Sequence, residues 1–532
     1  MIPAEGRCFR PIAALLAVTA LAVAGPASAK APAPESAARP ARAPNVVILY
    51  ADDLGYGDLG AYGARRVATP NTDALARAGL RFTDAYAPAA TCTPSRYALL
   101  TGEYGFRSHA EILPGDAAAL IRPGKATIAS VLKARGYTTG VIGKWHLGLG
   151  DGTVDWNGSV APGPLEIGFD YSFLLPATLD RVPTVYLDGH KVVGVDPADP
   201  IKVSYSAPLA GRPIGRQHPE LLRYKADDQH SDSIVNGVSR IGYMQGGKKA
   251  EWVDEDIHAV LADKARGFIR ANRDHPFLLY FPIPDPHVPR LPGKAFRGKT
   301  AMGPRGDAIV EMDWIVGQVM AELRQQGLSR DTLVIFSSDN GPVLNDGYED
   351  GAVEKLGDHA PGGVYRGGKY SALEAGTRVP LIASWPGHIK PGNSPALFSQ
   401  IDLLATLARI ARAPLAPDQA IDSRDMLAAL TGSDRRGRSE LFTESVPSVA
   451  IRKGRYKYIA PAAHPATAAF IAGKGIESGA SPMPQLYDLV RDPGERSNLA
   501  SAQPGLAATL AARLRAIAAR RTAERKPAAP AR

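Results

Sequence analysis

The chain has 532 residues, enough for one large domain and a smaller one, and 45% of them are hydrophobic. It carries 62 lysine and arginine residues against 53 acidic ones, a net charge of +9. This charge belongs to the two ends: residues 1–45 carry +3 and residues 513–532 carry +6, so the chain between them is neutral. A protein that binds long polyanions usually carries its basic residues on the folded body. We therefore expect no nucleic-acid partner.

The N-terminus has the parts of a secretory signal. Two arginines lie among the first ten residues, residues 12–25 are apolar, and residues 27–29 read Ala-Ser-Ala, a cleavage sequence. The apolar stretch is short for a membrane span. We therefore expect a signal peptide over residues 1–29, which takes Cys8 with it, and a linker rich in alanine and proline over residues 30–44. The mature protein should be periplasmic or secreted, with no stable membrane insertion.

From residue 45 onward, apolar runs alternate with amphipathic stretches, a pattern typical of an α/β fold. Continuous branched apolar runs predict strands that are buried on both faces. These runs lie at residues 46–50, 139–142, 277–281 and 333–336. Helical periodicity predicts helices over residues 304–327 and 403–410. We expect one catalytic domain over residues 45–434.

The pattern changes after the catalytic domain. Residues 448–459 predict a pair of strands, and we expect a smaller C-terminal α+β subdomain over residues 435–512. A basic tail follows over residues 513–532. Within the catalytic domain, the stretch 190–250 has no clear periodicity and is expected to form long loops.

Once the signal peptide is removed, Cys92 is left as the one cysteine, so it cannot form an intramolecular disulfide. Pro94 suits the first turn of a helix, and residues 97–100 continue that helix. We therefore expect Cys92 at a helix N-terminus, where backbone N–H groups and the helix dipole favour an anion. Arg96 adds a positive charge one turn on. An unpaired cysteine is most often a small buried hydrophobe, but these neighbours indicate an anion site around a reactive atom.

Each of the four predicted buried strands is followed by polar residues. In chain order these are Asp52 and Asp53, Lys144 and His146, Asp285 and His287, and Asp339 and Asn340. Ligands collect beyond the carboxyl ends of strands in open α/β sheets, so we expect these groups in one site. The first and last pairs offer only oxygen ligands, and adjacent carboxylates repel each other unless a cation neutralises them. Such a set selects a hard ion, Ca²⁺ or Mg²⁺, over zinc.

Several motifs resemble those of one known family. The sequence C-T-P-S-R at residues 92–96, followed by Thr-Gly at 101–102, is similar to the signature of the type I sulfatases, in the alkaline-phosphatase superfamily. The block at residues 374–380 and the closing motif at 486–499 also resemble this family. The resemblance covers roughly residues 45–500. It implies the family's fold, a large mixed sheet flanked by helices with a smaller C-terminal subdomain.

The resemblance also implies two cofactors. A maturation enzyme would oxidise Cys92 to formylglycine, an aldehyde whose hydrate is the nucleophile, before export. One divalent ion, usually calcium, would be bound, with magnesium as the other hard ion that fits the oxygen ligands. The ligands implied are Asp52, Asp53, Asp339, Asn340 and the formylglycine hydroxyl at position 92.

The same resemblance assigns roles to the other candidate residues. Arg96 matches the arginine that holds the formylglycine, and Lys144 and Lys369 match lysines that hold sulfate oxygens. His287 matches the histidine that donates a proton to the leaving alcohol. His146 matches the group that assists release of sulfate from the covalent intermediate.

Other polar and aromatic residues near these motifs are expected to play lesser parts. Asp285 is expected to be structural and to orient His287. Thr178 corresponds loosely to a serine that some family members place near the sulfate. Three aromatic residues are expected to pack or to line the rim: Tyr56, Trp145 and Tyr365.

The resemblance implies an exported sulfatase that hydrolyses sulfate monoesters, on a carbohydrate and on simple aryl sulfates. One alternative is a phosphonate monoester or phosphodiester hydrolase of the same superfamily, in which histidine commonly stands where this chain has Asn340. A second is a catalytically inactive glycan-binding relative, which is disfavoured because no site position is missing. Groups that select the substrate are expected within residues 180–190, 218–243 and 345–366. The sequence does not identify the sugar or the position of its sulfate.

Overall fold

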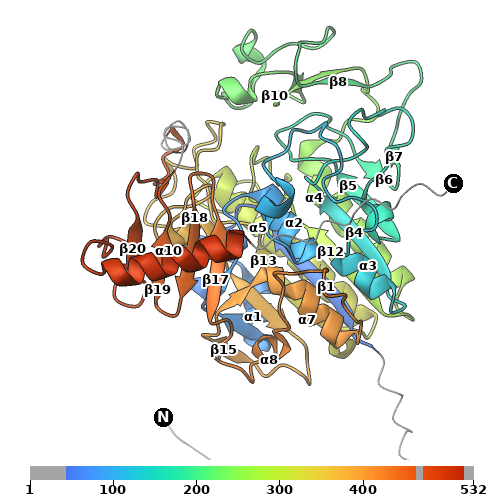
Figure 1. The fold of residues 1–532 in the computed structure, drawn as a ribbon. Helices are drawn as coiled ribbons and strands as arrows, with labels where there is room; N and C mark the ends of the chain where they lie inside the picture. The colour runs from blue at the N-terminus through green and yellow to red at the C-terminus, as the bar shows by residue number, and fades with distance from the viewer. Residues whose placement is uncertain (1–42, 463–470, 472, 520–532) are drawn as a thin grey trace, which may run out of the picture. The chain divides into compact units, whose positions relative to one another are not determined.

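The computed structural model describes residues 43–462, 471 and 473–519 of the chain (Figure 1). The expected signal peptide and most of the expected linker lie outside these residues, as does the end of the expected basic tail. Among the described residues, no helix has both the length and the apolar character needed to cross a bilayer.

A ten-stranded mixed sheet forms the centre of the fold. Its middle strands are parallel, and antiparallel pairs occur towards both edges. In spatial order the strands are β15 (Gly392–Ser394), β2 (Leu80–Phe82), β14 (Leu381–Ser384), β13 (Thr332–Ser338), β1 (Asn45–Ala51), β12 (Phe277–Pro282), β4 (Thr138–Lys144), β5 (Tyr171–Leu175), β6 (Leu187–Asp188) and β7 (Lys191–Val192). The four buried strands predicted from apolar runs are β1, β4, β12 and β13, which confirms the predicted α/β fold.

Helices cover both faces of the sheet. Successive residues of a strand point to opposite faces, so the continuous apolar runs give each face its own apolar side chains to bury. Val46 and Ile48 belong to the core of one face, and Val47 and Leu49 to the core of the other. The first core is covered by α2 (Cys92–Thr101), α3 (Ile128–Lys133), α7 (Leu403–Ile410) and α8 (Leu427–Leu430). The second is covered by α1 (Pro70–Ala78), α4 (Ile257–Ala271) and α5 (Pro304–Gln325). The two helices predicted from periodicity are α5 and α7.

The C-terminal part forms a smaller antiparallel sheet. Its strands are, in order, β17 (Glu440–Glu444), β18 (Val449–Lys453), β19 (Tyr456–Ile459) and β20 (Gln485–Asp488). The strand pair predicted at residues 448–459 is β18 and β19. Helix α10 (Pro504–Ala518) packs on this sheet, where Leu510 and Leu514 share a core with Ile451 and Tyr458. This helix continues past residue 513, so the first residues of the expected tail are helical.

The stretch 190–250 contains short strands where long loops were expected. β8 pairs with β11, and β9 pairs with β10, both in antiparallel fashion. Their bounds are Lys202–Ser204 (β8), Ile234–Val235 (β9), Val238–Ser239 (β10) and Tyr243–Gln245 (β11). Strands of two or three residues are too short for an alternating pattern to stand out in a sequence.

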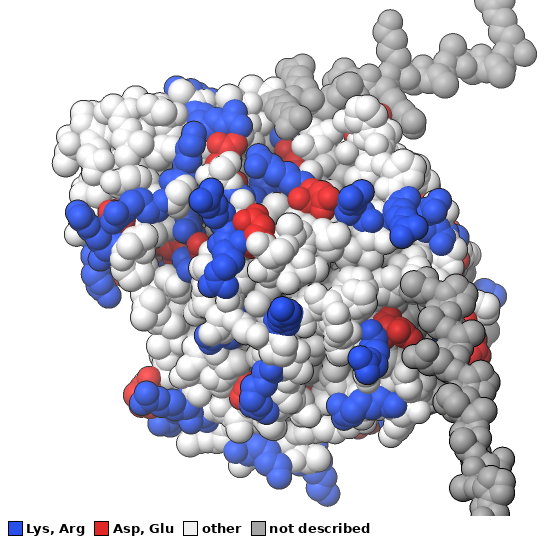
Figure 2. All heavy atoms as spheres, turned by 90° about the horizontal axis from the view of Figure 1, so that it is seen from below, with Lys and Arg blue, Asp and Glu red and all other residues white. Residues whose placement is uncertain are grey.

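Charged side chains of both signs share the face of the molecule that Figure 2 displays. Lysine and arginine side chains are spread over this face, and acidic side chains lie among them. The absence of a nucleic-acid partner remains a prediction from the sequence.

Candidate active site

The predicted site residues meet at one edge of the sheet, where the parallel strands end. β1 ends just before Asp52, β4 ends at Lys144, and β13 ends just before Asp339. Every predicted site residue is at most 2% exposed: Asp52, Asp53, Cys92, Arg96, Lys144, His146, His287, Asp339, Asn340 and Lys369. Strand ends, helix α2 and the loop before α6 (Glu374–Thr377) therefore each contribute to this group of ten buried residues.

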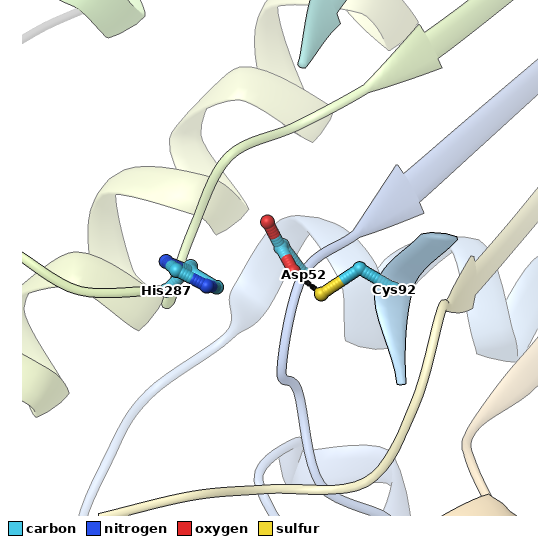
Figure 3. Close-up of side chains that lie close together, drawn as sticks. All are labelled: Asp52, Cys92 and His287. Carbon is cyan, nitrogen blue, oxygen red and sulfur yellow. Dashed lines mark hydrogen bonds between the residues drawn. The ribbon is translucent and has the colours of Figure 1, made fainter. Parts of the chain in front are cut away.

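Cys92 is the first residue of α2, as its sequence context predicts. The helix follows Thr91, whose backbone is extended, and ends at Gly102, which has a φ of 68° and thus the left-handed conformation that glycine allows. The Sγ of Cys92 lies 3.6 Å from Oδ1 of Asp52, and His287 faces the same space (Figure 3). Burial raises the pKa of the Cys92 thiol above its ordinary value.

The oxygen ligands form a compact group. Ligand atoms of Asp52, Asp53, Cys92 and Asp339 all lie within 4.8 Å of one another. Asn340 donates from Nδ2 to Asp53 at 2.7 Å, while its Oδ1 is buried without a hydrogen-bond partner among the described residues. Burial and the charge of Asp339 raise the pKa of Asp52 to about 8. Three carboxylates side by side and an unpartnered carbonyl oxygen fit a hard cation.

Arg96 and Lys144 supply positive charge on one side of this group. Nη2 of Arg96 lies 2.7 Å from Oδ2 of Asp339 and 3.6 Å from Oδ2 of Asp52. Lys144 forms an ion pair with Asp52, and its backbone oxygen accepts a hydrogen bond from Nη1 of Arg96 at 3.2 Å. Burial acts to raise the pKa of Asp339, but Arg96 and Lys144 together lower it below its ordinary value.

Lys369 adds a third positive charge and has two carboxylate partners. Its Nζ lies 2.9 Å from Oδ2 of Asp53 and 2.8 Å from Oδ2 of Asp346. Asp346 also accepts a hydrogen bond from the Tyr370 hydroxyl at 2.9 Å. The sequence placed Asp346 in a stretch expected to select the substrate, and did not indicate that it pairs with Lys369.

The two candidate histidines face the cluster in different ways. Nδ1 of His287 lies 2.7 Å from the Val288 oxygen, which leaves Nε2 facing the site, 3.8 Å from Oδ2 of Asp53. Nε2 of His146 lies 2.9 Å from the Leu113 oxygen, and its Nδ1 is buried without a hydrogen-bond partner among the described residues. Burial, followed by the charge of nearby lysines, holds the pKa of both histidines well below the ordinary value.

A pocket leads to Cys92 from the surface. It is lined by Cys92, Ile112, His146, Asp180, Arg181, Gln229, His230, Ile241, His287, Asp346, Lys369 and Tyr370. Each of the three stretches expected to select the substrate contributes to this lining. On one wall, His230 lies 3.2 Å from Asp180 through Nε2, and Asp180 lies 3.1 Å from Arg181.

Two nearby polar residues, Asp285 and Thr178, are buried outside the pocket lining. The carboxylate of Asp285 faces His258, with Oδ2 2.5 Å from Nε2 of that ring, so an effect of Asp285 on the orientation of His287 would run through the backbone. Thr178 is not among the described residues that line the pocket, and its hydroxyl accepts a hydrogen bond from Arg181 at 2.9 Å.

Asp180 and Arg181 were missed as individual site residues. They follow β5, a fifth parallel strand at the same sheet edge. Its apolar run at residues 173–175 is the signal that could have revealed them. The three aromatic residues expected to pack or to line the rim do pack: Trp145 is buried in the core, and Tyr56 packs edge-to-face on Tyr365.

Comparisons with known proteins identify the family of this chain. The sequence profile of the sulfatase family matches residues 44–413. An N-acetylgalactosamine-6-O-sulfatase of Bacteroides thetaiotaomicron is 47% identical over 480 residues, which cover 90% of this chain and 93% of the relative. Human arylsulfatase A is 37% identical over 473 residues, covering 86% and 84% of the two chains.

The fold is also similar to that of a solved structure from a study of the metabolism of multiple glycosaminoglycans by Bacteroides thetaiotaomicron. The two share 46% sequence identity and a TM-score of 0.88, over 90% of this chain and 100% of the other. Sequence and fold therefore agree along nearly the whole described chain. The chain belongs to the sulfatase family, and is a sulfuric ester hydrolase.

Proposed function

We propose that this protein is exported and removes sulfate from a glycan, with 6-O-sulfated N-acetylgalactosamine as the preferred sugar. The observation that carries the proposal is a pocket that ends at Cys92 and is lined by basic, acidic and histidine side chains. The 47% identity to an N-acetylgalactosamine-6-O-sulfatase over 93% of its length supports this choice of sugar.

We further propose that the site holds one hard divalent cation. Oxygen atoms of Asp52, Asp53, Asp339 and Asn340 would be its protein ligands, and the unpartnered Oδ1 of Asn340 supports the assignment. A bound cation would lower the pKa of the attacking hydroxyl and shield the anionic ester. We propose formylglycine at position 92, which as its hydrate would supply one hydroxyl to attack sulfur and a second to expel sulfate.

The basic residues are placed to receive the sulfate group. Lys144 and Lys369 are buried beside Cys92, and in the free protein they pair with carboxylates. We propose that they turn their ammonium groups to the sulfate oxygens when the ester binds, because charge develops on those oxygens during transfer. Arg96, held by Asp339 and Asp52, stays in place as a fixed charge below the nucleophile.

The histidines are suited to opposite proton transfers. Nδ1 of His287 faces the Val288 oxygen, so Nε2 is the atom that would carry a proton to the leaving oxygen. Burial and two lysines keep the pKa of His287 low in the free protein, and an anionic ester beside the ring would counter the lysines and raise it. Nε2 of His146 faces the Leu113 oxygen, which leaves Nδ1 as the base that would accept a proton while sulfate is expelled.

Replacing His287 with alanine should slow hydrolysis of a sugar sulfate by at least ~10²-fold, the lower range of a general acid's contribution. An activated nitrophenyl sulfate should be largely spared, since its leaving group departs as a stable anion. Steady-state kcat/KM on both substrates checks this. His146→Ala serves as the comparison, because it should instead accumulate sulfated enzyme. Equal slowing of both substrates by His287→Ala would assign that histidine to sulfate binding.

The protein should prefer sulfate esters over phosphonate monoesters and phosphodiesters by a wide margin. The reason is a compact site with one proposed cation and an asparagine at position 340, where hydrolases of phosphodiesters commonly place histidine. Matched aryl sulfate, phosphonate and phosphodiester substrates, compared by kcat/KM, provide the measurement. A phosphonate or phosphodiester optimum would favour the alternative activity.

The sugar preference is tested with a panel of defined sulfated mono- and disaccharides. N-acetylgalactosamine 6-sulfate should be cleaved with the highest kcat/KM, and its 4-sulfate and the 6-sulfate of N-acetylglucosamine should be poor substrates. Each comparison changes one feature, the sulfate position or the configuration of one hydroxyl. A better rate on either of the other two would overturn the proposed sugar, while the sulfatase assignment would stand.

A further inference from the structure

A second buried cluster lies behind the active site, formed by His258, Asp285 and Glu311. His258 is in the first turn of α4, Asp285 follows β12, and Glu311 is on α5. Their side chains are each 3% exposed. Nε2 of His258 lies 2.5 Å from Oδ2 of Asp285, and Nδ1 lies 3.4 Å from Oε2 of Glu311. The imidazole thus bridges two carboxylates that belong to different elements.

Each carboxylate of this cluster lies closest to its own ring nitrogen of His258, at the distance of an ion pair and not in hydrogen-bond geometry. Ligand atoms of the three residues also lie within 4.8 Å of one another. A doubly protonated imidazolium would place positive charge between the two carboxylates. Burial acts to lower the pKa of His258, but Asp285 and Glu311 raise it to about 9.

The cluster connects to the active site through the backbone of Asp285. The Asp285 oxygen accepts a hydrogen bond from the Asp52 N–H at 3.0 Å, and His287 lies two residues further on. At the far end of the same segment, the Gly293 N–H donates to Oε2 of Glu311 at 3.0 Å. His258 therefore joins the two carboxylates that hold both ends of the segment carrying His287.

We propose that His258 is a positioning residue, which acts through Asp285 and Glu311 to place His287 against the leaving oxygen. This inference rests on the proposed function, in which His287 donates the proton. Removing the imidazolium would leave two buried carboxylates without the positive charge between them, and their repulsion would shift the segment 285–293. Loss of outer partners of active-site groups typically costs about 10–100-fold in activity.

The test is His258→Gln, which keeps a similar side-chain length and one N–H donor but removes the positive charge and the bridge. On N-acetylgalactosamine 6-sulfate, kcat/KM should fall by about 10–100-fold, while 4-nitrophenyl sulfate should be little affected. His359→Gln is the matched control, because His359 is also a buried histidine, with Nε2 2.7 Å from Asp58. Its loss should not change the ratio of the two substrates.

A double-mutant cycle with His287→Ala separates positioning from general damage. If His258 acts through His287, then His258→Gln should cost little further activity on the sugar sulfate once His287 is alanine. A full additional loss in that background, or equal losses on both substrates in the single variant, would overturn the inference. The cycle measures whether His258 and His287 are coupled, and this result does not depend on the chemical role of His287. The role of His287 as the acid is tested separately, by comparing the losses of His287→Ala on the sugar sulfate and on the nitrophenyl sulfate.

Glu311→Gln provides a second variant in case His258→Gln does not fold. It keeps the His258–Asp285 pair and an oxygen for the Gly293 N–H, but weakens one end of the bridge. The same selective loss on the sugar sulfate should appear, with a smaller size than for His258→Gln. An unchanged substrate ratio in well-folded Glu311→Gln, judged by thermal unfolding, would also count against the inference.

Discussion

Replacing Cys92 with serine is expected to abolish turnover, with a loss on the order of 10⁶-fold in kcat, the size seen when a catalytic nucleophile is removed. A serine hydroxyl could accept the sulfate once, but it has no second hydroxyl to expel it. Intact-protein mass spectrometry after incubation with substrate should therefore find the serine variant carrying sulfate. Cys92→Ala is the control, since it should be equally inactive and carry none.

Mass spectrometry of peptides from the wild-type protein tests the proposed modification. A peptide that spans residues 91–96, from protein made in a host with a maturation enzyme, should contain formylglycine at position 92. Buried beside Asp52, the thiol has a raised pKa and would be a poor nucleophile if left unmodified. Full activity in a preparation that holds only the thiol would contradict the proposal.

Replacing Asp53 with alanine is expected to lower bound metal and activity together. A catalytic cation contributes several kcal/mol to the transition state, so the loss in kcat/KM should be about 10³–10⁴-fold on every substrate. Elemental analysis after mild dialysis should find one calcium or magnesium ion per wild-type chain and much less in the variant. This uniform loss differs from the selective loss expected for His287→Ala.

Asp313→Asn is a suitable control for Asp53. Asp313 is also a buried aspartate, but it accepts hydrogen bonds from the Thr72 amide and hydroxyl, both at 2.7 Å, and belongs to the contact between α1 and α5. Its replacement should change stability without changing metal content. Two zinc ions per chain, or an inactive Asp53→Ala protein with its full complement of metal, would refute the proposed one-cation site.

The sequence was most informative where strands are buried on both faces. β1, β4, β12 and β13 carry continuous apolar runs because helices cover both sides of the sheet, and such runs stand out without an alignment. Their ends then locate the site, since parallel strands all finish at one edge. The polar residues that follow β1, β4 and β13 all lie in the pocket lining or in the group of oxygen ligands. Of the two polar residues that follow β12, only one does. In that pair, His287 enters the pocket and Asp285 turns to His258.

The sequence was least informative for polar residues that are buried away from strand ends. His258 and Glu311 lie within helices α4 and α5, away from any strand end, and nothing in the sequence around them marks them as buried. Only the packing of α4 against α5 places them face to face beneath the sheet edge. One of the two carboxylate partners of Lys369 was hidden for a similar reason, because Asp346 reaches it from a loop without periodicity.

The burial of Cys92 sets a limit on when it can be modified. The side chain is 2% exposed, all ten residues of α2 around it are buried, and Asp52 closes the approach from β1. β1 in turn pairs with β12 and β13, whose residues lie more than 200 positions later in the chain. An enzyme that acts on the Cys92 thiol must therefore reach it before those later strands join the sheet. Under the proposed modification, chains that fold first would remain thiol-bearing and inactive, and the active fraction of a preparation would be decided during synthesis.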